Sequence, residues 1–94
     1  MSTRIENLRK ALEDQLHPVE LKVDDESAQH VGHAGAARGG GHFRVYIVCP
    51  KFSGRPLLAR HRMVYEALGE QMREQILALS IVARAPEEVS AGAG

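Results

Sequence analysis

Apolar residues near the start of the chain recur at steps of three and four, which is the spacing of one face of a helix. These residues are Ile5, Leu8, Leu12 and Leu16. Thr3 and Glu6 have the spacing of a capping box just before this pattern. Pro18 follows it, and a proline ends a helix. The sequence therefore predicts a helix that stops before Pro18.

Two later segments alternate apolar and polar residues, which is typical of half-buried strands. The first runs from Val19 to Asp24, and the second from Phe43 to Cys49, where Pro50 ends it. Between them, Ala28 to Gly41 is rich in glycine and alanine and has no periodicity. A connection of this length in a small domain is either functional or mobile.

The segment from Leu58 to Leu77 is helical in composition. Its predicted buried stripe steps by four through Val64, Leu68, Met72 and Ile76. Gly69 divides this run into two helices in one interpretation. Alternation of apolar residues predicts a third strand that begins near Leu77 and ends before Pro86.

The predicted order is helix, strand, strand, one or two helices, strand, that is αββααβ. The first two strands pair antiparallel, and the third follows a helical crossover and lies parallel to its partner. The result is an α/β (α+β) domain with a three-stranded mixed sheet and helices on one face. We expect one domain over residues 1–88 and a disordered tail over 89–94.

Composition narrows the function classes. The 94 residues are 44% hydrophobic, so the chain is not disordered, and 12 basic residues balance 12 acidic ones. Zero net charge argues against a generic polyanion binder. The single cysteine excludes an intramolecular disulfide and predicts a cytoplasmic protein. No apolar run is long enough to span a membrane, and we expect no secretory signal.

Several short fragments occur in a specific order along the chain. They are Asp25-Glu26-Ser27, His30 in the loop, His42-Phe43, Phe52-Ser53-Gly54, Arg60-His61-Arg62-Met63-Val64-Tyr65, Ala78-Leu79-Ser80-Ile81 and Ala85-Pro86-Glu87-Glu88. Together, from about Ile5 to Glu88, they resemble the BolA family. The resemblance implies a fold similar to a type II K-homology domain and a non-enzymatic adaptor without a small-molecule substrate.

The resemblance also implies two binding activities. One is a complex with a monothiol glutaredoxin, with or without a 2Fe–2S cluster shared with the glutaredoxin and glutathione, in iron–sulfur trafficking or iron and stress regulation. The alternative is a transcriptional regulator that binds DNA through a helix-turn-helix-like segment around residues 60–76.

His30 and His33 lie three apart in the glycine-rich loop, and neutral imidazole is a good ligand for iron. Two histidines do not close a site, so the partner's thiolates would complete it; alternatively both are solvated loop residues. The family usually carries a second ligand histidine just before the Ala-Leu of its last strand, where this chain has Leu77. The remaining candidates for a second donor are His33, His42, His61 and Cys49. A complex without a cluster is the other possibility.

Arg60, His61 and Arg62 fall in the first turns of the predicted central helix, where cations oppose the helix dipole. Their functional interpretation is a recognition surface for an acidic partner or for phosphates, extended by Arg55 and Lys51. The structural alternative is a solvated polar face with His61 packed or hydrogen-bonded.

Residues that could support catalysis do not form a recognisable set. Asp25-Glu26-Ser27 has no base, nucleophile or cofactor loop beside it in the sequence. Gly39-Gly40-Gly41 lacks the lysine of a phosphate-binding loop. We expect Cys49, which ends a strand, to be a small buried hydrophobic residue.

Overall fold

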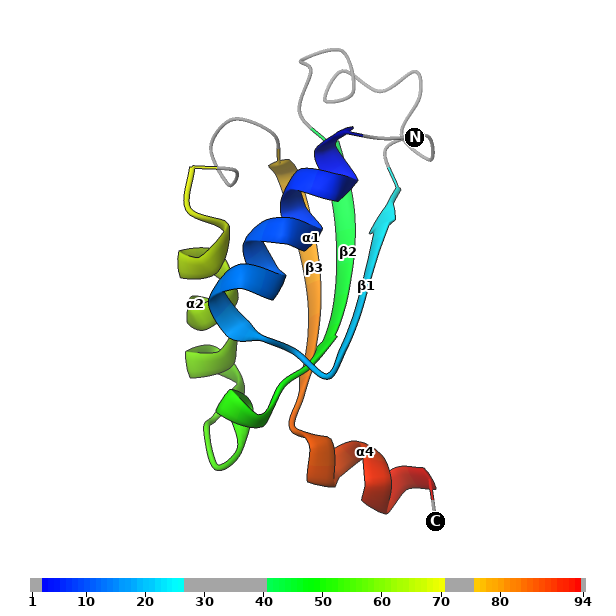
Figure 1. Ribbon diagram of the computed structural model, residues 1–94, viewed down its shortest axis with the longest axis vertical. Helices are drawn as coiled ribbons and strands as arrows, with labels where there is room; N and C mark the ends of the chain where they lie inside the picture. The colour runs from blue at the N-terminus through cyan, green and yellow to red at the C-terminus, as the bar shows by residue number, and fades with distance from the viewer. Residues whose placement is uncertain (1–2, 27–40, 71–75, 94) are drawn as a thin grey trace.

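The computed structural model describes residues 3–26, 41–70 and 76–93. A three-stranded sheet forms one layer and two helices form the other (Figure 1). The elements are α1 (Thr3–Leu16), β1 (Glu20–Asp25), β2 (Gly41–Val48), the 3-10 turn η3 (Pro50–Phe52), α2 (Leu57–Leu68), β3 (Ile76–Arg84) and α4 (Pro86–Ala93). The first helix and both alternating strands lie where the sequence predicts them.

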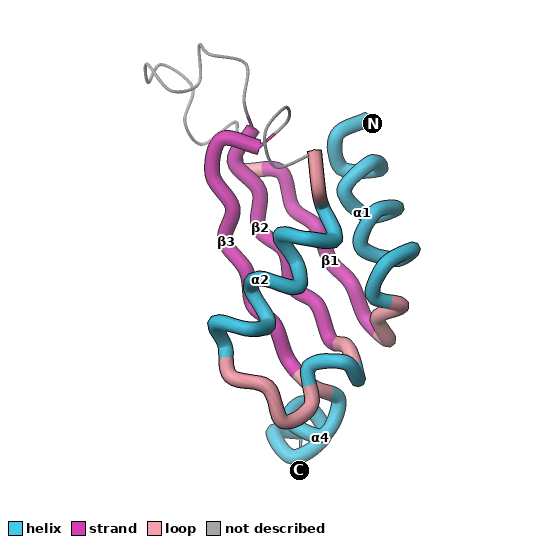
Figure 2. Tube along the Cα trace, turned by 90° about the vertical axis from the view of Figure 1, so that its left-hand side faces the viewer, coloured by secondary structure: helices cyan, strands magenta, loops and turns pink. Residues whose placement is uncertain are grey.

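The sheet has the strand order β1-β2-β3. β1 pairs antiparallel with β2, with Val23 opposite Val45, and β2 pairs parallel with β3, with Val45 opposite Ile81. Both helices lie on one face of the sheet, α1 over the β1 side and α2 over the β3 side (Figure 2). The predicted mixed sheet with helices on one face is confirmed.

The hydrophobic core lies between these two layers. Its fully or almost fully buried members from the helices and the η3 turn are Leu8, Leu12, Leu16, Phe52, Val64 and Leu68. The strands contribute Val23, Phe43, Val45 and Ile47 from the face that the helices cover. The chain has no tryptophan, so aliphatic side chains make up most of the contact between the helices and the sheet. Phe43 and Phe52 are the largest buried side chains.

The end of α1 is tied to the residues that follow β2. His17 adopts a left-handed φ of 50°, and Pro18 follows, so the helix stops at Leu16. The last carbonyls of a helix lack intrahelical partners. Here the Cys49 thiol donates to the Leu16 carbonyl at 3.1 Å, and the Lys51 ammonium donates to the Gln15 carbonyl at 3.1 Å.

The central helix is shorter than the sequence predicts. α2 ends at Leu68, because Gly69 has a φ of 55° and donates its N–H to the Tyr65 carbonyl. Ile76 opens β3 and is not a helical residue, so the predicted four-residue stripe is wrong at this position. Residues 71–75, which include Met72 and most of the possible second helix after Gly69, lie outside the described residues.

The C-terminal segment forms helix α4 where the sequence predicts a disordered tail over 89–94. Pro86 is at the first helical position, which suits its fixed φ and missing N–H. Glu87 and Glu88 place negative charge in the first turn. Glu88 also accepts the Ala85 N–H at 2.8 Å, as the fourth residue of a capping box does. These start signals were present in the sequence beside Pro86.

We expect Leu12→Ala to destabilise the protein by about 2–5 kcal/mol, because it leaves a cavity in the core. Leu12 is completely buried, whereas Leu58 on α2 is 64% exposed. The matched control Leu58→Ala makes the same chemical change at the surface and is expected to stay within about 0.5 kcal/mol of the parent. Urea unfolding of the three proteins checks this. Equal losses for both variants would contradict the assigned core.

Candidate functional site

The side chain of Arg60 is buried and forms hydrogen bonds within the fold. It is 5% exposed, and its guanidinium donates to both oxygens of Glu88 at 2.7 and 2.8 Å. It also donates to the Ala83 carbonyl at 3.0 Å and, through Nε, to the Arg55 carbonyl at 2.8 Å. The prediction of Arg60 as a surface recognition residue is therefore wrong. A buried guanidinium needs this set of acceptors because desolvating it is costly.

The ion pair changes the titration of both partners. The hydrogen bonds from Arg60, together with the Ala85 N–H, lower the pKa of the Glu88 carboxyl to about 2, against an ordinary value of 4.5. The hydrogen bond to Glu88 in turn raises the pKa of Arg60 further above its already high value. Glu88 was not among the predicted functional residues, although its position two residues after Pro86 marks a helix start.

The other predicted recognition residues lie around the start of α2. Lys51, Arg55 and Arg62 are exposed, and His61 is half-buried. Arg55 donates through Nε to the Lys51 carbonyl at 3.0 Å, which closes the turn after η3. Arg62 is thus the exposed cation of the Arg60-His61-Arg62 triplet, while Lys51 lies in η3 and Arg55 in the loop before α2.

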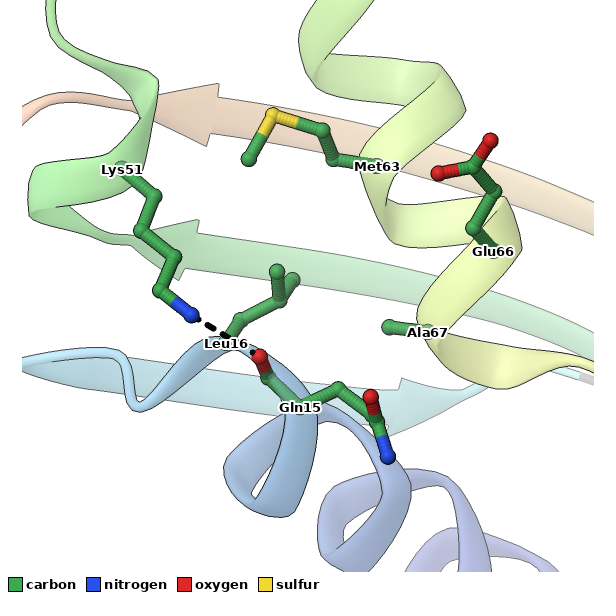
Figure 3. A pocket seen from close by; sticks show the side chains of 6 residues that line it. All are labelled: Gln15, Leu16, Lys51, Met63, Glu66 and Ala67. Carbon is green, nitrogen blue, oxygen red and sulfur yellow. Dashed lines mark hydrogen bonds between the residues drawn. The ribbon is translucent and has the colours of Figure 1, made fainter.

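A shallow pocket of about 260 Å³ lies beside this basic surface, between the end of α1 and α2 (Figure 3). Leu16, Met63 and Ala67 supply its apolar lining, and Lys51 and Glu66 supply charges of opposite sign. The Lys51 ammonium is already bonded to the Gln15 carbonyl there. The arrangement is a surface depression with a capped helix end, and it has no set of converging catalytic groups among the described residues.

One candidate ligand, His42, lies at the opposite end of the sheet, where β2 and β3 begin. His42 is half-buried on β2 opposite Ala78, and its main-chain carbonyl accepts the Glu26 N–H at 2.7 Å. Leu77 lies on β3 at the register irregularity between the Gly41 and His42 pairings. The structure therefore brings His42 and the backbone of Leu77 together. His30 and His33, with the rest of the loop, lie outside the described residues.

The two remaining donor candidates lie elsewhere. Cys49 is completely buried and its thiol is bonded to Leu16, as expected for a structural cysteine. His61 lies next to Arg60 on α2, and the Arg60 guanidinium binds the Ala83 carbonyl. Ala83 is six residues from Leu77 along β3, which is roughly 20 Å of strand. His61 is therefore near the opposite end of the strand from Leu77. Within residues 3–26, 41–70 and 76–93, no three His, Cys, Asp or Glu side chains gather as a metal site.

The structure is a two-layer α+β domain in which two helices cover one face of a mixed β1-β2-β3 sheet. The family model for BolA-like protein matches residues 12–88 of this chain. The chain therefore belongs to the BolA family.

Known proteins similar to this chain come from plants, mammals and bacteria. SufE-like protein 1 of Arabidopsis thaliana is 42% identical over 95% of this chain, and Protein BOLA1 of the same plant is 42% identical over 94%. The DNA-binding transcriptional regulator BolA of Escherichia coli is 37% identical over 81% of this chain and 70% of its own length. The solved BolA domain of SufE1 has a TM-score of 0.81 at 42% identity, covering 94% of this chain and 98% of that domain.

The chain corresponds to only part of each of the two plant relatives. The chain spans only 25% of SufE-like protein 1 and 57% of BOLA1. Their names place them in the chloroplast, and in the mitochondrion for the first, so the cytoplasmic location of this chain stays a prediction. In the part of the chain that the structure describes, no helix combines the length and apolarity that a bilayer span needs.

The ion pair between Arg60 and Glu88 gives a testable pH dependence. Because the folded-state pKa of Glu88 lies below its ordinary value, its stabilising effect is complete above pH 4.5 and is lost as the pH falls toward about 2. Glu88→Gln mimics the protonated side chain. We expect this variant to be less stable than the parent at pH 7, with the difference shrinking between pH 4.5 and about 2.

Urea unfolding at a series of pH values measures this difference. Glu87→Gln is the matched control, because Glu87 accepts a hydrogen bond from Ser53 at the surface and not from Arg60. A Glu88→Gln difference that is the same at every pH would contradict the role of the carboxylate charge.

Proposed function

We propose that this BolA-family chain is a non-enzymatic adaptor that binds a monothiol glutaredoxin and shares a 2Fe–2S cluster with it. The observation that supports the proposal is the position of His42, which lies at the sheet end beside Leu77. The usual family histidine is absent at Leu77, and His42 is the described imidazole nearest to that position. Family membership supports a binding role, while the partner and the cluster belong to the proposal.

The donors available to this chain suit a shared site and not a closed one. Imidazole is a known ligand for iron in 2Fe–2S clusters of the Rieske type, in which two histidines bind one of the two irons. A complete site needs about four donors. We assign His42 and the loop residue His30 to this side of the site, and the glutaredoxin and glutathione thiolates to the other. His33 remains the alternative loop donor.

The proposed ligand role of His42 can be tested by visible circular dichroism of a cluster-loaded monothiol glutaredoxin. Titration with the parent chain is expected to give a new spectrum that saturates near one equivalent. His42→Ala is expected to lose most of this change, because it removes one of this chain's donors. His61→Ala, at a site remote from the sheet end, is the matched control and is expected to behave like the parent.

Two outcomes count against the proposal in different ways. An unchanged spectrum with the parent chain would exclude cluster sharing, and calorimetry with cluster-free glutaredoxin would then test the complex alone. A new spectrum that His42→Ala leaves intact would keep the partner and reject His42 as the donor.

The second candidate function is DNA binding by the basic surface at the start of α2. Two observations favour it: the E. coli relative is named a DNA-binding transcriptional regulator, and Lys51, Arg55 and Arg62 are each exposed. In the described residues the predicted 60–76 element consists of a helix to Leu68 and a strand from Ile76. Contact with DNA would therefore use the exposed side of α2.

We expect Arg62→Ala to weaken binding to a duplex and to reduce the slope of log K against log salt by about 1, because one phosphate contact is lost. Lys10→Ala on α1, where Lys10 pairs with Asp14 at 3.5 Å, is the charge-matched control. Fluorescence anisotropy at several salt concentrations measures both. No binding by the parent at low salt would exclude this function.

A further inference from the structure

The two edges of the sheet differ in how they are protected against pairing with another strand. In β1, Glu20, Lys22, Asp24 and Asp25 are charged, and charges discourage edge-to-edge association. In β3, the run from Ile76 to Ala83 has no charged residue and no proline. Among the described residues, β3 pairs with β2 alone and no strand lies on its other side. The edge without charged side chains is therefore the one at β3, although Arg60 already binds the Ala83 carbonyl at its end.

The backbone groups that face this edge can be identified. The Cys49 N–H donates to the Arg84 carbonyl, so the polar groups of Arg84 face β2. Directions alternate along a strand, so the N–H and C=O groups of Leu79 and Ile81 face the free edge. The Ala83 carbonyl faces the same way, in agreement with its hydrogen bond from Arg60. The side chains of Leu79 and Ile81 are only half-buried against the core.

An apolar flank of α2 adjoins the same edge. Met63, Glu66 and Ala67 line the pocket toward α1, so they mark the α1 side of α2. Leu58 and Tyr65 are seven residues apart on a different stripe of the helix, and both are exposed. α2 lies over the β3 side of the sheet (Figure 2), and the spacing of Leu58 and Tyr65 puts them on the side of the helix away from α1. An added strand at β3 would thus meet apolar surface from both layers.

We propose that the β3 edge is the dimerisation site for a second copy of this chain, paired antiparallel about a two-fold axis. The strand suits itself, since an uncharged edge meets an uncharged edge and each copy offers the same half-buried aliphatic side chains. The two sheets would join into one six-stranded sheet. The α2 helices would lie side by side over the seam, where the exposed Leu58 and Tyr65 of each copy would be covered.

The strand itself sets the register of this pairing. The register that overlaps all of Ile76–Arg84 with its symmetry mate centres the axis on Ser80. Leu79 then lies opposite Ile81 of the second copy, and these residues have backbone groups that face the edge. Ser80 meets Ser80 as a non-hydrogen-bonded pair, in which side chains approach most closely. Ser80 is exposed, so substitution there does not disturb the core.

Introducing a charge of either sign at Ser80 tests the pairing directly. We expect the parent to show concentration-dependent dimerisation in sedimentation velocity. Ser80→Lys and Ser80→Glu are each expected to weaken it by roughly tenfold or more, because like charges would face each other across the axis. An equimolar mixture of the two variants is expected to restore a dimer. Gln15→Lys, an exposed position on α1, is the control for added charge and is expected to dimerise like the parent.

The mixture keeps the test independent of folding, because variants that failed to fold would not recover on mixing. A parent that remains monomeric at all concentrations would overturn the proposal, as would variants that dimerise unchanged. A parent that stays monomeric but binds a monothiol glutaredoxin, with binding lost in Ser80→Lys, would assign the edge to that partner and also overturn it.

Discussion

The buried guanidinium of Arg60 is the constraint on which much of the structure depends. A charge this well shielded from water is tolerated only with a carboxylate and further acceptors in place. Arg60 meets this requirement by binding Glu88 with two hydrogen bonds and the carbonyls of Ala83 and Arg55 with one each. The end of β3, the start of α4 and the turn before α2 are thus fixed to a single side chain of α2. Loss of either charged partner would leave the other uncompensated.

The two ends of the sheet differ in how their polar side chains are used. At one end, Arg60 and Glu88 hold the elements together, and Cys49 and Lys51 bind the last carbonyls of α1. Polar groups there are largely used by the fold. At the other end, β2 and β3 begin, with His42 opposite Ala78 and Leu77 at an irregular register. The proposed partner site is placed at this second end, because it is where His42 and the backbone of Leu77 come together.

The alternating strands and the stripe of α1 were predictable because each has one buried face, so hydrophobic periodicity reports it directly. The end of α2 at Gly69 was ambiguous, since a glycine in a helical run either ends the helix or is tolerated. α4 was missed because Pro86 was interpreted as a stop and not as a first helical residue. Arg60 was misplaced because a basic triplet suggests a surface. Its spacing of four from Val64, and then Leu68, was the signal that it belongs to the buried stripe.

The proposed dimer and the proposed partner complex use adjoining parts of the same strand. Strand pairing along β3 would extend to Leu77, which lies at the sheet end that also carries His42. A second copy on this edge would therefore crowd a partner that approaches the cluster donors. A partner that binds the monomer and not the dimer shifts the equilibrium between the two toward the monomer. If the partner binds only the monomer, it draws the chain out of the dimer, and the dimer in turn weakens apparent partner affinity. The uncharged sequence of β3 would then serve as a reversible cover for the binding end.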